Sequence, residues 1–323
     1  MEYIRDFKHI DKGDAAIAGG KGASLGEMTQ AGILIPSGFV VLAGAFERFL
    51  ESTDLNTEID SILHDVRHEE IHTVENASAK IQEMVLRAKM PEDIAAEIKD
   101  NFKKLGAEYV AVRSSATSED STSAAWAGQL DTFLNTTEED LLENVQKCWA
   151  SLFTPRAIFY RFEKKMHKNI ILVAVVVQKM VQSESAGIAF SVHPVTEDRN
   201  QLIIEAGFGL GEAIVSGKIT PDSYVVEKNP RRIIDKNAST QNSMLIRANK
   251  HIVKNESANE WVDVREPKAS SQVLTDAQIL ELTELTLKIE AHYGFPCDIE
   301  WAFEKGKFYV TQSRPITTLS GRA

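Results

Sequence analysis

The last part of the chain alternates between polar and apolar residues in a pattern that predicts two paired strands. Residues 298–303 alternate, residues 304–306 interrupt the alternation, and residues 307–314 resume it. Alternation of this kind is typical of a strand with one buried face, and a short interruption that contains glycine is typical of a turn. The pattern therefore predicts a hairpin over residues 298–314.

The length of the turn decides which side chains of this hairpin share a face. A three-residue loop, with Gly306 in the left-handed conformation, sets Glu300 opposite Val310 and Asp298 opposite Gln312. Because side chains alternate between the faces of a strand, one face is then expected to carry Asp298, Glu300, Gln312 and Arg314. Carboxylate and amide oxygens beside a guanidinium suit a nucleotide with Mg²⁺, and a solvated polar face is the alternative interpretation.

Elsewhere the periodicity divides the chain into a helix-rich half and a strand-rich half. Helical periodicity dominates residues 45–104, with breaks near Asp54, Thr73 and Pro91, and further helices are expected at about 138–151, 155–165 and 275–292. Branched residues predict strands at 109–112, 171–181, 187–192, 202–205 and 223–227. We therefore expect a mixed α+β fold with two lobes, residues 1–180 and 181–323, and a ligand-binding cleft between them.

Composition narrows the classes of protein to which the chain can belong. Its 323 residues carry a formal net charge of −11, which argues against a general binder of nucleic acid or of anionic membranes. We find no secretory leader and no apolar run long enough to cross a bilayer, so the expected location is cytoplasmic. Cys148 and Cys297 lack the spacing of a disulfide framework or a zinc site, and both are expected to be buried.

Two segments of the first half are candidates for phosphate binding. Residues 19–26 form a glycine-dense loop before a helix, where backbone N–H groups and Lys21 would contact an anion, although the spacing is not that of a Walker A motif. Arg113 follows a strand and precedes small polar residues, 114–120, which we interpret as a lid over a ligand. The alternatives are a tight turn for the first segment and a surface arginine in a linker for the second.

Gln178 and three histidines are weaker candidates. Gln178 lies in a very apolar strand and is either a hydrogen-bonded core residue or a contact to the edge of an adenine. His64, His68 and His72 are four residues apart, which on a helix lines one face, but the adjacent glutamates favour a solvated face over a metal site.

Six motifs together resemble one known family. They are GGKGASL at 19–25, AVRSSA at 111–116, AGQLDTFLN at 127–135, CWASLFT at 148–154, GFGLGE at 207–212 and QSRPI at 312–316. The set resembles the N-terminal ATP-binding domain of phosphoenolpyruvate synthase (pyruvate, water dikinase), a domain shared with pyruvate, phosphate dikinase and rifampin phosphotransferase. The resemblance extends over essentially the whole chain. It implies a single ATP-binding domain, residues 1–323, with the ATP-grasp fold and the nucleotide in the cleft between two lobes.

The resemblance also implies roles for the candidate residues of the first half. Lys21 and Arg113 would hold the ATP phosphates. Gly128 and Thr132 would line the phosphate loop, and Gln178 would lie near the adenosine.

For the hairpin, the resemblance implies a metal site and a charge stabiliser. Glu300 and Gln312 would ligate Mg²⁺ with Asp298 in support, and Arg314 would stabilise charge on the transferring group. This division fits phosphoryl transfer, in which the protein contributes positioning and electrostatics. The expected catalytic residues are then Arg314, Lys21 and Arg113.

In this family the phosphoryl or pyrophosphoryl group passes from Mg-ATP to a histidine on a separate swivelling domain, and then to an acceptor on a third domain. None of the histidines here has the context of that motif. We therefore expect a phosphotransferase of the pyruvate, water dikinase type that is incomplete as this chain alone and performs the first half-reaction of phosphoenolpyruvate synthesis. Its partners would be a phosphohistidine swivelling domain and a pyruvate-binding barrel, in the same longer chain or in a separate subunit.

Two alternative functions follow from the same residues. One is the ATP-binding domain of a rifampin-type antibiotic phosphotransferase, which differs in domains that this sequence does not contain. The other is a regulatory module that binds a nucleotide without turnover. Such a module has less need of metal ligands together with a charge stabiliser, so the complete set of residues argues against it.

Overall fold

The computed structural model describes residues 2–117, 131–164, 171–248, 258–317 and 319. The chain divides into two compact units. The first unit comprises Met1–Glu27 and Ser37–Met180, and the second comprises Met28–Pro36 and Val181–Ala323. Both units combine helices with antiparallel sheets, so the prediction of a mixed α+β fold is confirmed.

The elements of the first unit follow the predicted order of helices and strands. They are β1 (Ile4–Asp6), the 3-10 helices η1 (Phe7–His9) and η2 (Lys12–Asp14), α1 (Ala15–Gln30), β2 (Gly38–Val41), α2 (Ala43–Ser52), α3 (Leu55–His64), α4 (Ile71–Arg87), α5 (Glu92–Leu105), β3 (Val110–Ala116), β4 (Thr132–Thr136), α6 (Leu141–Ala150), η3 (Ser151–Phe153), α7 (Pro155–Glu163) and β5 (Val173–Lys179). The last three residues of α1 belong to the second unit.

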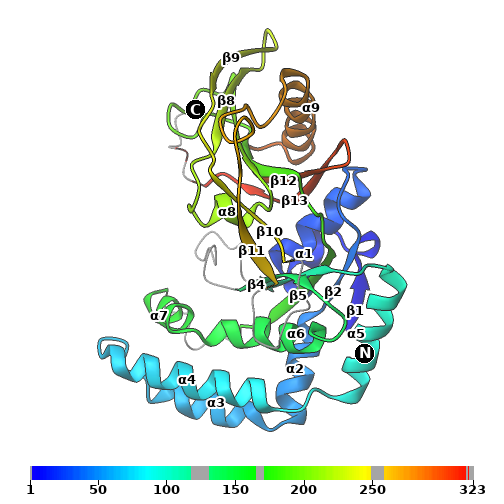
Figure 1. The fold of residues 1–323 in the computed structure, drawn as a ribbon. Helices are drawn as coiled ribbons and strands as arrows, with labels where there is room; N and C mark the ends of the chain where they lie inside the picture. The colour runs from blue at the N-terminus through cyan, green and yellow to red at the C-terminus, as the bar shows by residue number, and fades with distance from the viewer. Residues whose placement is uncertain (1, 118–130, 165–170, 249–257, 318, 320–323) are drawn as a thin grey trace. The chain divides into compact units, whose positions relative to one another are not determined.

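The strands of the first unit form an antiparallel sheet in the order β1-β2-β5-β3-β4, and helices cover one of its faces (Figure 1). Val110 and Val112 on that face join a core that includes Phe46 and Trp149, whose rings stack at 5.4 Å between centroids. Side chains alternate along β3, so Arg113 is directed to the opposite face. The apolar positions of β3 thereby decide where its polar positions lie.

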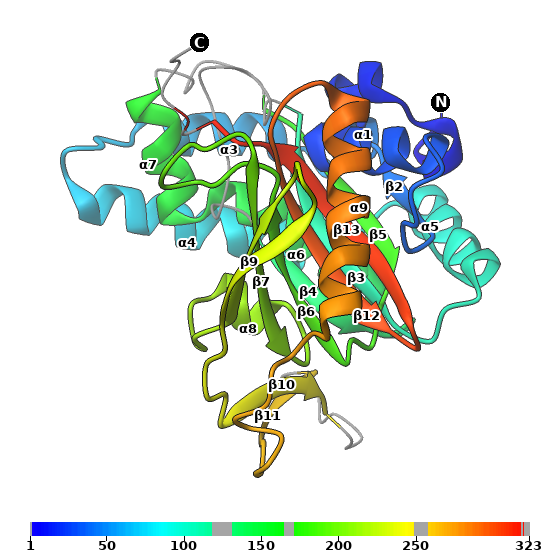
Figure 2. The ribbon, with the colours of Figure 1, turned by 90° about the horizontal axis from the view of Figure 1, so that it is seen from above.

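The second unit is built around a larger antiparallel sheet. Its elements are β6 (Ser185–Phe190), β7 (Gln201–Phe208), α8 (Glu212–Val215), β8 (Asp222–Glu227), β9 (Arg232–Asn237), β10 (Ser243–Arg247), β11 (Asn259–Asp263), α9 (Asp276–Tyr293), β12 (Cys297–Glu304) and β13 (Lys307–Pro315). Six strands pair in the order β13-β12-β6-β7-β8-β9, and β10 and β11 form a separate two-stranded sheet. Figure 2 shows α9 lying along the six-stranded sheet, against which its apolar side buries Ile279, Leu282 and Ile289.

The boundaries of α9 agree with the predicted helix over 275–292. Thr275 accepts a hydrogen bond from the backbone of Gln278, whose side chain bonds back to Thr275, so a capping box begins the helix. Gly294, at φ 76°, ends it in the left-handed conformation that glycine adopts without strain.

Two predictions about the helical region are wrong. The break expected near Thr73 lies earlier, between α3 and α4, because Thr73 is inside α4 and caps the preceding turn through its hydroxyl. For the same reason His64, His68 and His72 do not share one helix: His64 ends α3, His68 lies in the connection and His72 begins α4. No group of three or more His, Cys, Asp or Glu side chains that could hold a metal ion occurs in the described part of the chain.

The prediction of a hairpin at the end of the chain is confirmed, but its turn is one residue shorter than predicted. Glu304 pairs with Lys307, so the turn consists of Lys305 and Gly306, both with positive φ (50° and 77°). Two left-handed residues match the twist of the flanking strands, which explains why this turn replaces the three-residue loop. A second shift follows at a bulge between Glu300 and Trp301.

These two shifts correct the predicted pairing and leave the predicted face intact. Glu300 lies opposite Gln312 and not Val310, and Asp298 lies opposite Arg314 and not Gln312. The turn and the bulge each move the pairing by one residue. The total shift is two residues, which equals the period of a strand, so the same side chains remain on the same face. Directly opposite residues share a face, so Asp298, Glu300, Gln312 and Arg314 lie on one face as expected.

Both cysteines are buried, as predicted. Burial raises the pKa of the Cys148 thiol and that of the Cys297 thiol to about 12. Among the described residues, no helix combines the length and the apolar character that crossing a bilayer requires.

A buried carboxylate holds the connections of the second unit onto its sheet. Asp222 is fully buried and accepts hydrogen bonds from the Tyr224 hydroxyl (2.6 Å) and the Val273 backbone N–H (2.8 Å). The Ser239 backbone N–H (3.0 Å) and the Gln241 side-chain amide (3.2 Å) complete the set. Burial, followed by the bond to Asp222, raises the pKa of the Tyr224 phenol.

We expect Asp222→Ala to lower the free energy of unfolding by about 3 kcal/mol, because it leaves several buried donors without an acceptor. Tyr224→Phe removes one of the four bonds and should cost about 1 kcal/mol. Denaturant unfolding monitored by circular dichroism measures both values. Equal losses for the two variants would contradict the assignment of Asp222 as the common acceptor.

Candidate functional site

The glycine-dense segment forms a break within a helix, and not a loop that precedes one. α1 is interrupted at Gly19, whose φ of 68° and ψ of 168° belong to a region that only glycine occupies readily. A Cβ on Gly19 would lie 2.2 Å from Ser115 Oγ and 2.4 Å from the Ser115 carbonyl oxygen, so no other residue fits this close approach. Lys21 follows the break in the first turn of the second helical segment and is half-buried.

Three other predicted residues of the first unit gather on one face of its sheet. Arg113 is buried, with 8% of its surface exposed, and its Nη1 donates a hydrogen bond of 3.4 Å to Gln178 Oε1. Thr132 lies directly opposite Arg113 across the β3–β4 pair. Gln178 lies opposite Ala111 on the other side of β3, two residues from Arg113 and therefore on the same face.

The position of Arg113 corrects one expectation. It was predicted at the end of a strand, but β3 continues to Ala116, and Ser114 and Ser115 are buried strand residues. These serines therefore do not belong to a lid. Residues 118–130, including Gly128, lie outside the described residues, so the lid and the role of Gly128 stay predictions.

The polar face of the hairpin brings two oppositely charged groups into contact. Arg314 Nε donates a hydrogen bond of 2.8 Å to Asp298 Oδ2, and the side chains of these residues are 43% and 13% exposed. Glu300 lies on the same face, next to Asp298 and opposite the buried amide of Gln312. Two carboxylates, an amide and a guanidinium thus share one face of two strands.

The electrostatics of Asp298 indicate how this face fits a cation. Burial raises the pKa of its carboxyl; the cation of Arg314 opposes this shift, and the charge of Glu300 adds to it. Asp298 Oδ1 is buried and has no hydrogen-bond partner among the described residues. A buried carboxylate oxygen without a partner beside further oxygen donors fits a hard divalent cation such as Mg²⁺.

The structure adds one residue that the sequence-based prediction missed. Glu205 in β7 shares the polar face of the hairpin, because it pairs with Ile188 of β6, which in turn pairs with Glu300. Burial, with a smaller contribution from the charge of Asp298, raises the pKa of the Glu205 carboxyl. A single carboxylate in the apolar strand 202–206 was the available signal, but only the strand order brings it near Asp298.

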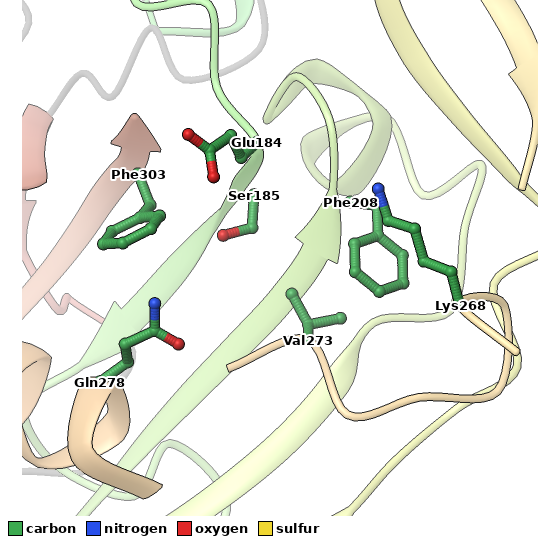
Figure 3. Close-up of a pocket in the computed structure, with 7 residues that line it drawn as sticks. All are labelled: Glu184, Ser185, Phe208, Lys268, Val273, Gln278 and Phe303. Carbon is green, nitrogen blue, oxygen red and sulfur yellow. The ribbon is translucent and has the colours of Figure 1, made fainter. Parts of the chain in front are cut away.

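The second unit has a cavity of about 170 Å³, and none of the predicted site residues lines it (Figure 3). Its lining consists of Glu184, Ser185, Phe208, Lys268, Val273, Gln278 and Phe303, and the Lys268 amine lies 4.7 Å from the centre of the Phe208 ring. Phe303, Ser185 and Phe208 are successive partners across three strands, so they share the face on which α9 packs. Glu300 is on the other face of β12, and the two features are therefore separate.

Comparison with known proteins identifies the family of this chain. The family model described as "Pyruvate phosphate dikinase, AMP/ATP-binding domain" matches residues 15–323. The chain belongs to this family. The resemblance inferred from the six motifs is thereby confirmed.

Two kinds of name occur among the proteins that are similar to this chain. A probable phosphoenolpyruvate synthase from Methanocaldococcus jannaschii is 44% identical over 99% of the chain, which spans 27% of that relative's length. A probable phosphoenolpyruvate synthase from Methanothermobacter thermautotrophicus is 43% identical over 99% of the chain and 46% of its own length. Rifampicin phosphotransferase from Bacillus subtilis is 39% identical over 98% of the chain and 36% of its own length. The chain thus spans less than half of each of these proteins.

The contact between Asp298 and Arg314 gives a prediction about stability. Arg314→Ala removes the group that opposes the raised pKa of Asp298, so the cost of burying the ionised carboxylate increases, by about 1 kcal/mol for a partly exposed pair. A raised folded pKa means that the stabilising contribution is present below the unfolded pKa of about 3.9 and is lost as the pH rises through the folded pKa. The destabilisation of Arg314→Ala should therefore grow as the pH rises.

Urea unfolding between about pH 4 and pH 8 measures this dependence. Arg232→Ala is a matched control, because it removes an ion pair with Glu227 from the same sheet at a side chain that is 65% exposed. A loss for Arg314→Ala that does not change with pH would contradict the electrostatic explanation.

Proposed function

We propose that this chain binds Mg-ATP and transfers phosphoryl, or pyrophosphoryl, to a histidine on a separate swivelling domain, as the first half-reaction of phosphoenolpyruvate synthesis. The observation that carries the proposal is the polar face of the β12–β13 hairpin, where two carboxylates and an amide lie beside a guanidinium in a chain of an AMP/ATP-binding family. Relatives named phosphoenolpyruvate synthase, at 44% and 43% identity over nearly the whole chain, support the choice of reaction.

The proposal assigns a role to each polar residue of the first unit. Lys21, which follows the break in α1, holds the ATP phosphates as a point charge. The buried Arg113 holds them with its planar, forked guanidinium. Gly128 and Thr132 line the phosphate loop. Gln178, whose oxygen accepts a hydrogen bond from Arg113, lies near the adenosine.

The hairpin supplies the metal ligands in this proposal. Glu300 and Gln312 hold Mg²⁺, and Asp298 supports them with the oxygen that has no partner among the described residues. A metal held there would neutralise negative charge on the phosphates. Arg314, fixed by Asp298 at 2.8 Å, stabilises the charge that develops on the transferring group.

The ATP-grasp fold, with the whole chain as one ATP-binding domain, is part of the same proposal. An ATP-grasp domain contacts one nucleotide with both of its lobes, so the residues of both units are assigned to a single ligand. The chain spans less than half of its named relatives, which accords with the acceptor histidine and the pyruvate-binding barrel being in other domains or subunits.

Rifampicin phosphotransferase is the second candidate, and the Bacillus subtilis relative favours it at 39% identity over 98% of the chain. Its first half-reaction would use the same residues, because acceptor specificity lies outside this chain. The two functions can be distinguished by mixing the chain with the histidine domain of each kind of enzyme and measuring which domain receives phosphate.

Calorimetry with Mg-ATP tests the binding step. Glu300→Ala should weaken Mg-ATP binding by about 10- to 100-fold, as expected for the loss of a metal ligand, and should remove its dependence on Mg²⁺. Glu304→Ala is the matched control, since Glu304 is an acid on the same face of the same strand and pairs with its neighbour Lys305. Equal affinity for Glu300→Ala and Glu304→Ala would contradict the metal assignment.

The transfer step has its own test. We expect the chain, mixed with Mg-ATP and a separately expressed histidine domain of a phosphoenolpyruvate synthase, to place acid-labile phosphate on that domain. Arg314→Ala should slow the transfer by about 10²- to 10³-fold while binding of Mg-ATP changes much less, because the arginine acts on charge that develops during transfer. Binding of Mg-ATP without any transfer would favour the regulatory module.

A further inference from the structure

One buried hydroxyl holds both sides of the break in α1. Ser115 is 0% exposed, and its Oγ donates a hydrogen bond of 3.0 Å to the carbonyl oxygen of Ala18. The same oxygen accepts a hydrogen bond of 3.3 Å from the backbone N–H of Gly22. Ala18 is the residue before the break at Gly19, and Gly22 directly follows Lys21. The Ser115 hydroxyl therefore bridges the two helical segments across the residue that the proposed function assigns to phosphate.

The backbone on both sides of Lys21 rests on the sheet of the first unit. The approach of Gly19 to Ser115 leaves no room for a Cβ, as described above. A Cβ on Gly22 would lie 3.2 Å from Val40 Cγ2, which places the next turn of α1 against β2. Close packing at both ends fixes the position of the Lys21 backbone, from which a flexible four-carbon side chain extends.

Ser115 also connects Lys21 to Arg113. The two β3 residues are separated by one position, so they lie on the same face of the sheet. Arg113 projects from β3 itself, whereas Lys21 is held against β3 through the Ser115 hydroxyl. A single strand thereby sets the spacing of two cations.

We propose that Ser115 is a positioning residue for phosphate binding: its hydroxyl fixes the Lys21 backbone relative to Arg113 and so lowers the cost of ordering the two cations around a triphosphate. The inference rests on the proposed function. The gain comes from preorganisation, because a lysine whose backbone is already placed loses less conformational freedom when the ligand binds.

The first test compares two neighbouring buried serines. Ser115→Ala should weaken ATP binding by about ten-fold, the effect of one hydrogen bond of ordinary strength. Ser114→Ala is the matched control: Ser114 is 1% exposed, and its hydroxyl hydrogen-bonds to the Asp131 and Cys148 carbonyls and to the Ser151 hydroxyl, none of which belongs to α1. Both variants should lose similar stability, but Ser114→Ala should keep ATP affinity within about three-fold.

A double-mutant cycle separates positioning from a general loss of structure. If Ser115 acts through Lys21, Ser115→Ala should add little to the weakened ATP binding of Lys21→Ala, and the two effects should be non-additive. In the Arg113→Ala background the effect of Ser115→Ala should persist. A merely structural role gives the same additive loss in both backgrounds, and this result would overturn the proposal.

The outcomes also distinguish this inference from the proposed function. Failure of the wild-type chain to bind ATP would refute the proposed function. ATP binding that weakens in Lys21→Ala but stays at the wild-type level in Ser115→Ala would refute the positioning role alone.

If Ser115→Ala does not fold, Ser115→Cys is the second variant, because it retains the side-chain volume with a weaker hydrogen-bonding group. The ATP affinity of Ser115→Cys should fall below that of the wild type. Unchanged affinity would again refute the positioning role.

Discussion

The alternation of side chains across two antiparallel sheets is the constraint on which the rest of this structure depends. In each unit helices cover one face of the sheet, and this face takes apolar side chains, such as Val112, which shares a core with Trp149, in the first unit and the buried Ile299 in the second. The residues between them are directed to the opposite face. Arg113 and Glu300 lie on the faces that they occupy because the residues next to them in each strand face the helices.

The polar faces carry charges at a cost that the structure only partly offsets. Burial raises the pKa values of Asp298 and Glu205; the negative charge of Glu300 adds to the shift of Asp298, and that of Asp298 adds to the shift of Glu205. Arg314 compensates one oxygen of Asp298 and leaves the other without a partner among the described residues. Sites that are arranged for a cation often retain such uncompensated acids, since the ligand itself supplies the missing charge.

In the first unit the candidate site depends on a close backbone contact, whereas in the second unit it depends on charged side chains. Gly19 contacts β3 so closely that a Cβ is excluded, and the Ser115 hydroxyl spans the resulting break in α1. Lys21 is held against β3 by these contacts, and Arg113 lies on the face of β3 that also carries Ser115. The two residues therefore provide cations of different geometry. The lysine is a point charge and the arginine is a planar fork, so together they suit the several oxygens of a polyphosphate.

Local patterns in the amino-acid sequence were enough to predict the family, the α+β composition, the helix that became α9, and the face shared by Asp298, Glu300, Gln312 and Arg314. These features depend on local periodicity and on motifs, which are properties of short segments. The tertiary structure decided the pairing of the hairpin, because the turn at Lys305–Gly306 and the bulge at Glu300 are set by strand twist and by neighbouring strands. It also decided that Glu205 lies near Asp298 and that Ser115 meets Gly19, since both contacts join residues nearly a hundred positions apart, and no local pattern records which distant segments pair.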